Sequence, residues 1–76
     1  MTKQKFLEAY RNYCVATYAW AADVPKLASF MTSVEQTLTT ERTSWVWDGT
    51  GSKAAWKAMG AKGPMTLKAL RALPAI

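Results

Sequence analysis

Residues 3–40 read KQKFLEAYRNYCVATYAWAADVPKLASFMTSVEQTLTT, and this stretch decides the fold because apolar side chains recur in it with helical spacing. We expect a first helix from about Lys3 to Ala22, with the hydroxyl of Thr2 as its N-cap. One face of this helix carries residues at intervals of three and four: Phe6, Tyr10, Tyr13, Thr17 and Trp20. A stripe of this kind is typical of a helix that packs against a core.

Asp23-Val24-Pro25 predicts a break and the start of a second helix. Asp23 is a good N-cap. Pro25 is tolerated in a first turn, because the N–H groups there form no hydrogen bond within the helix. We expect this helix to reach about Thr40, with an apolar stripe of five residues: Leu27, Phe30, Met31, Val34 and Leu38. Ser33 and Gln36 also match a capping box, which would divide the segment into two helices.

The C-terminal half predicts shorter elements. Trp45-Val46-Trp47 is expected to be a short extended piece, and residues 48–51 a loop, because Asp-Gly-Thr-Gly is a turn composition. Gly49 to Lys53 lack the spacing of a phosphate-binding loop. We then expect a helix over 53–59, capped by Ser52 and ended by Gly60, and a last helix over 67–73, capped by Thr66 and ended by Pro74.

These elements predict an all-α fold, a compact bundle of three to four helices in one domain over residues 1–76. The two N-terminal helices would pack antiparallel, and the C-terminal pair would resemble a helix-turn-helix and close the core. The apolar side chains of that pair are expected to face inward: Trp56, Met59, Leu67, Leu70 and Leu73. A core this small gains stability from association, so we expect a monomer or a small homo-oligomer.

The net charge of +5 is concentrated at one end of the chain. Acidic and basic residues balance over 1–48, whereas residues 49–76 contain five cations and no acid. We expect these cations to form a binding surface, with Trp47 as an apolar contact: Lys53, Lys57, Lys62, Lys68 and Arg71. The partner would be acidic, either a protein surface or nucleic acid, although a small domain also carries such a charge for solubility alone.

Nucleic-acid binding is the alternative that a helix-turn-helix would favour. Thr66, Lys68 and Arg71 would then lie near the groove of DNA. The connection between the two helices is longer than usual, and few side chains suited to base edges follow Gln36. We therefore expect contacts with phosphates rather than sequence-specific recognition.

The composition argues against catalysis, metal binding and cofactor binding. The chain contains no His and a single cysteine, Cys14, which we expect to be a buried apolar residue. One cysteine forms no internal disulfide, which fits a reducing cytoplasm. No apolar run is long enough to span a membrane, so we expect no membrane partner.

Residues 47–74, WDGTGSKAAWKAMGAKGPMTLKALRALP, resemble small proteins encoded by bacteriophages. The overall appearance is also similar to the phage proteins that bind the RNA polymerase of the bacterial host and redirect transcription. The resemblance implies an accessory protein that occupies a surface of a host complex in the bacterial cytoplasm. It covers the C-terminal part of the chain and assigns a role to no individual residue.

Overall fold

The structure, a computed structural model, describes residues 1–39 and 50–75, and the regular elements in these ranges are helices. The elements are α1 (Lys3–Thr17), a 3-10 helix η1 (Ala19–Ala22), α2 (Val24–Thr39), α3 (Thr50–Ala58) and α4 (Leu67–Arg71). These ranges contain no strand, which confirms the predicted all-α bundle. The extended piece expected at Trp45-Val46-Trp47 and the turn at Asp48-Gly49 lie outside the described residues.

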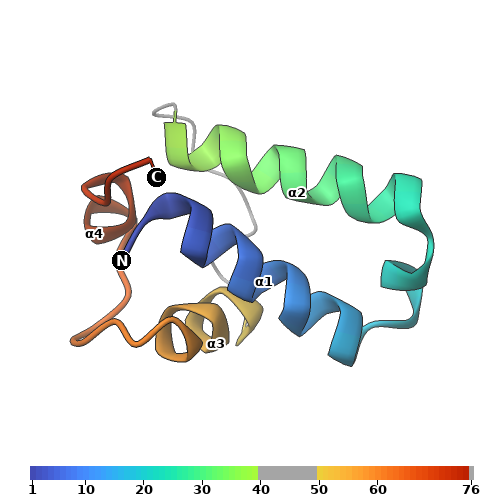
Figure 1. Ribbon diagram of the computed structural model, residues 1–76, viewed down its shortest axis with the longest axis horizontal. Helices are drawn as coiled ribbons and strands as arrows, with labels where there is room; N and C mark the ends of the chain where they lie inside the picture. Colours follow the sequence, from blue (N-terminus) through green and yellow to red (C-terminus); the bar gives the residue numbers. More distant parts are fainter. Residues whose placement is uncertain (40–49, 76) are drawn as a thin grey trace.

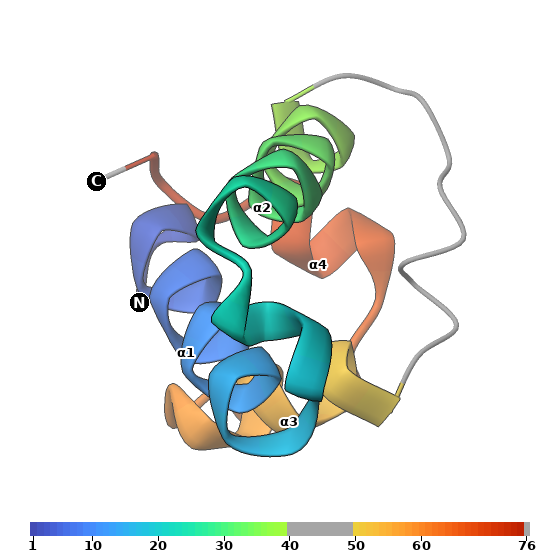
Figure 2. The ribbon, with the colours of Figure 1, turned by 90° about the vertical axis from the view of Figure 1, so that its right-hand side faces the viewer.

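The helix α1 lies between α2 and α3 (Figure 1). The chain reverses direction through η1, so that α1 and α2 run antiparallel, as expected. The helix α3 packs mainly on α1, and α4 packs on α2. Viewed along the bundle, α4 lies beside α2 and above α3 (Figure 2). The two C-terminal helices are therefore each held by a different N-terminal helix.

Aromatic and aliphatic side chains of α1 and α2 make the core. Phe6, Tyr10 and Cys14 of α1 are buried, as their helical spacing predicts. The Tyr10 ring lies between two aromatic neighbours, with its centroid 5.8 Å from that of Phe6 and 5.6 Å from that of Phe30, both in edge geometry. From α2 and the C-terminal helices come further buried residues: Leu27, Val34, Leu38, Ala55, Trp56 and Leu70.

The first helix is shorter than the sequence predicts. It ends at Thr17, which is exposed, and Tyr18 is extended with φ −113° and ψ 130°. The change of direction brings the Trp20 ring against Tyr18 in a stack at 5.5 Å and against Phe30 edge-on at 5.3 Å. The aromatic contacts outweigh continuation of the helix, since Thr and Tyr are weak helix formers.

The second helix begins and continues largely as expected. The Asp23 carboxylate accepts a hydrogen bond from the Lys26 N–H at 3.3 Å, which is the predicted N-cap contact. The helix is not divided at the capping-box motif, because the Ser33 hydroxyl donates to the carbonyl of Ser29 at 3.2 Å instead. The interpretation of Ser33 and Gln36 as a second helix start is therefore wrong.

The start of α3 corrects the prediction of a loop. Thr50, Gly51 and Ser52 are helical, and Gly51 and Ser52 are buried within α3 rather than preceding it. A Cβ at Gly51 would lie 3.0 Å from the Cε1 atom of Tyr13 and 3.1 Å from that of Tyr10. The glycine thus serves close packing of α3 on α1 and not a turn.

The ends of the C-terminal helices follow the predicted signals. Gly60 has φ +86°, and the Gly60 and Ala61 N–H groups donate to the carbonyls of Lys57 and Trp56, a Schellman motif. The Thr66 hydroxyl accepts from the Ala69 N–H at 3.0 Å and caps α4. The helix α4 ends at Arg71 instead of the expected Leu73, and the chain continues through a hydrogen-bonded turn.

Candidate functional site

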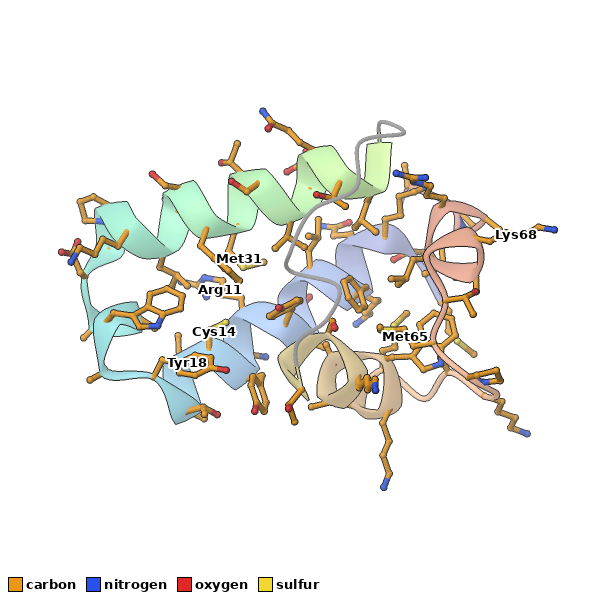
Figure 3. The ribbon with its side chains drawn as sticks, turned by 180° about the vertical axis from the view of Figure 1, so that it is seen from behind. Arg11, Cys14, Tyr18, Met31, Met65 and Lys68 are labelled. Carbon is orange, nitrogen blue, oxygen red and sulfur yellow. The ribbon has the colours of Figure 1, made fainter. Side chains whose placement is uncertain are left out.

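The lysines of the C-terminal part lie on the surface, as predicted. Lys53 and Lys57 project from α3, Lys62 from the connection between the helices, and Lys68 from α4; all four are exposed. In Figure 3, Lys68 points away from the body of the molecule. Residues 50–75 contain no acid, so no carboxylate of this part of the chain neutralises these lysines.

Arg71 has a contact within the fold in addition to its predicted place on the binding surface, and its role in binding stays a prediction. Its side chain is half-buried, and its Nε–H donates to the backbone carbonyl of Thr37 at 3.3 Å. This carbonyl belongs to the last turn of α2. A guanidinium also interacts favourably with the negative end of the helix dipole. Arg71 therefore fastens α4 to the end of α2.

Thr66 also has a structural role, as the N-cap of α4. Its hydroxyl accepts the capping hydrogen bond from Ala69. Of the three residues expected near DNA, Thr66, Lys68 and Arg71, the first and the last thus hold local structure. The described part of the chain presents Lys68 alone of the three as an exposed cation.

An apolar groove of about 470 Å³ lies beside α3. Lys53 and Lys57 line it from the helix, one turn apart, and Pro64 and Met65 line it from the connection to α4. Met65 lies between α3 and α4 (Figure 3). Two cations therefore stand directly beside an apolar surface, while Lys62 and Lys68 lie outside the groove.

The indole of Trp56 holds the far wall of the groove in place. Its Nε1–H donates to the carbonyl of Gly63 at 3.1 Å, and only 8% of the residue is exposed. Gly63 has φ +83°, a backbone conformation that side chains disfavour. The connection thus folds back over the indole and brings Pro64 and Met65 toward α3.

Sequence reasoning missed Pro64 and Met65 as members of this surface and chose Trp47 instead. Trp47 lies outside the described residues. A signal for the groove does exist in the sequence: glycines at positions 60 and 63 allow the chain to turn back toward the helix. Which helix side chain the returning chain meets depends on the hydrogen bond from Trp56.

The one thiol is buried in the core between α1 and its neighbours. Cys14 has no exposed surface, and this burial raises the pKa of its thiol. A protonated, enclosed thiol is a poor nucleophile, in agreement with the expected apolar role.

Two further properties bear on the chemistry of residues 1–39 and 50–75. They bring together no group of three or more side chains of the kinds that ligate metals. None of their helices combines the length and the apolar character that crossing a membrane requires.

Comparison with known proteins gives no relative. No protein-family model, no curated protein and no solved structure matches this chain. The fold and the surface therefore define the protein as a small all-α protein with a basic surface and an adjoining apolar groove.

Proposed function

We propose that this protein is a non-catalytic accessory protein of bacteriophage type that binds an acidic surface of a host protein complex. RNA polymerase in the bacterial cytoplasm is the first complex to test, and modulation of transcription is the expected result. The observation that carries the proposal is the placement of four exposed lysines on a part of the chain without acids: Lys53, Lys57, Lys62 and Lys68. Such a surface attracts acidic partners and accelerates their association.

A nucleic-acid partner is the second candidate, because the same lysines suit phosphates. Two observations favour protein over DNA. The helix α4 spans only Leu67–Arg71, and two of its three expected DNA contacts are engaged within the fold. In addition, the groove beside Lys53 and Lys57 is apolar. Apolar surface fits apolar side chains of a protein partner, whereas binding to a phosphate backbone does not need it.

The test measures binding of the purified protein to host RNA polymerase and, separately, to labelled duplex DNA at about 50 and about 200 mM salt. We expect stoichiometric binding to the polymerase, weakened about tenfold or more when all four lysines are changed to glutamate. A folded lysine variant that binds the polymerase as tightly as the wild type contradicts the proposal. DNA binding that weakens by a factor of tens or more over the same salt range, without polymerase binding, favours the second candidate.

A further inference from the structure

The groove beside α3 differs in the charge of its lining from two other hollows of the described surface. One hollow between α1 and α3 is lined by Lys5 and Glu8, and one between α1 and α2 by Glu8, Arg11 and Glu35. Both therefore carry cations and carboxylates together. Among the described residues, the lining of the α3 groove includes the cations Lys53 and Lys57 and no carboxylate. Its charge selects an acidic occupant.

The two edges of the groove differ in chemistry and therefore fit different side chains of a bound partner. Along one edge, Lys53 and Lys57 are four positions apart in α3, a rise of about 6 Å. Along the other edge, Met65 and Pro64 offer apolar surface. An extended peptide places alternate side chains on opposite edges, and residues two apart on one edge are separated by about 6.6 Å. That repeat matches the spacing of the two lysines.

From this match we propose that the groove binds an extended segment of another protein in which acidic and apolar residues alternate. The acidic residues contact Lys53 and Lys57, and the apolar residues pack on Met65 and Pro64. Met suits this role because its flexible thioether adapts to apolar side chains of different shapes. The inference rests on the proposed function and specifies the kind of partner that the basic surface takes.

The burial and hydrogen bonding of Trp56 argue against a single-stranded nucleic acid as the ligand of the groove. Proteins that bind single strands stack bases on open aromatic faces. The indole of Trp56 is almost fully buried, and its N–H is engaged by Gly63. Among the described residues, it is the only aromatic residue that lines the groove. The described lining therefore offers no open aromatic face for stacking, but it has an apolar wall for aliphatic side chains.

The experiment uses the full chain and fluorescence anisotropy of a short labelled peptide in which Asp or Glu alternates with Leu or Phe. Two control peptides keep the same net charge. One has the same composition with its acidic and apolar residues in separate blocks, and the other has Ser in place of every apolar residue. We expect the alternating peptide to bind about tenfold more tightly than either control.

Variants locate the binding on the protein. Lys53→Glu combined with Lys57→Glu should weaken binding of the alternating peptide about tenfold or more, whereas Lys26→Glu, on the exposed surface of α2, should change affinity less than about twofold. Met65→Gln should weaken binding, and Met65→Leu should restore it, which separates lost contact from lost folding. In an NMR titration, the indole N–H signal of Trp56 should shift, because this group holds the groove wall.

The outcomes separate this inference from the proposed function. Equal affinity for all three peptides overturns the inference, and so does a Lys26→Glu effect as large as that of the double variant at Lys53 and Lys57. If RNA polymerase still binds in a lysine-dependent manner, the proposed function stands without the groove. Competition by labelled duplex DNA for the same lysines, with no preference for the alternating peptide, also overturns the inference in favour of nucleic acid.

Discussion

Gly51 shows how a single residue sets the distance between two helices. It lies where α3 packs on α1, and a Cβ there would be 3.0–3.1 Å from ring atoms of Tyr10 and Tyr13. These contacts are tighter than a well-packed core accepts. Overpacking costs more than alanine gains in helix propensity at this site.

We expect Gly51→Ala to lower the free energy of unfolding by about 1–2 kcal/mol in urea denaturation. Tyr13→Ala in the same chain should remove part of this penalty, because it opens the space that the new methyl group needs. The double-mutant cycle then gives a coupling energy well above zero. Additive effects of the two changes would count against direct contact.

Tyr10 links the packing of the core to pH. Only 4% of it is exposed, and burial, with smaller contributions from Cys14, Tyr18 and Tyr13, raises the pKa of its hydroxyl to about 12. The folded state therefore retains this proton above pH 10, where the unfolded chain releases it. This contribution to stability is complete below about pH 10 and is lost as pH rises to about 12.

The measurement is the free energy of unfolding as a function of pH for the wild type and for Tyr10→Phe. We expect the wild type to lose about 1–2 kcal/mol more than the variant between about pH 10 and about 12. The comparison of slopes removes the pH effects that the two chains share. Parallel curves would show that Tyr10 is not responsible for the alkaline loss.

At the scale of elements, each C-terminal helix has a side chain that donates a hydrogen bond to a backbone carbonyl outside that helix. Arg71 joins α4 to the last turn of α2 through the Thr37 carbonyl, and Trp56 joins α3 to the connection through Gly63. Short helices are only marginally stable alone, so such tertiary contacts determine whether they form. The lysines between these contacts remain on the surface.

Arg71 and Lys68 form a matched pair on α4. We expect Arg71→Met to lower the free energy of unfolding by about 1–2 kcal/mol, because it removes the hydrogen bond to Thr37. Lys68→Met should change it by less than about 0.5 kcal/mol, since the exposed ammonium has no such role. Thermal denaturation followed by circular dichroism distinguishes the two. Equal effects of the two variants would contradict the structural role of Arg71.

At the scale of the whole molecule, the two ends of the chain close the bundle together. Both termini lie at the α4 end (Figure 1). The Lys3 N–H donates to the carbonyl of Pro74 at 2.7 Å and the Gln4 N–H to that of Ala75 at 3.3 Å, while the Lys5 N–H donates to the Thr2 hydroxyl. The first N–H groups of α1, which a helix leaves without partners, are thus satisfied partly from the other end of the chain.

Deletion of residues 74–76 should therefore loosen the start of α1. We expect the free energy of unfolding to fall by about 1–2 kcal/mol and the amide hydrogens of Lys3 and Gln4 to exchange faster. The Lys5 amide provides an internal control, because its acceptor on Thr2 remains. Unchanged exchange at Lys3 and Gln4 would show that these hydrogen bonds contribute nothing.

The candidate site could be predicted in part. The positions of the four exposed lysines follow from charge asymmetry and helical spacing, because a charged side chain on a helix has a strong preference for water. The roles of Arg71 and Thr66 did not follow, since a sequence does not show which carbonyl or N–H lies within reach. The apolar wall of Pro64 and Met65 depends likewise on where the chain returns after Gly63.

The sequence by itself determined the all-α class, the core stripe of α2, the caps at Thr2, Asp23 and Thr66, and the termination at Gly60. These features depend on interactions within one or two turns, which local residue order fixes. Only the tertiary structure decided that α1 ends at Thr17, that Gly51 lies inside a helix, and that Arg71 is part of the fold. In each of these cases, the deciding contact joins residues of different elements, which local residue order does not specify.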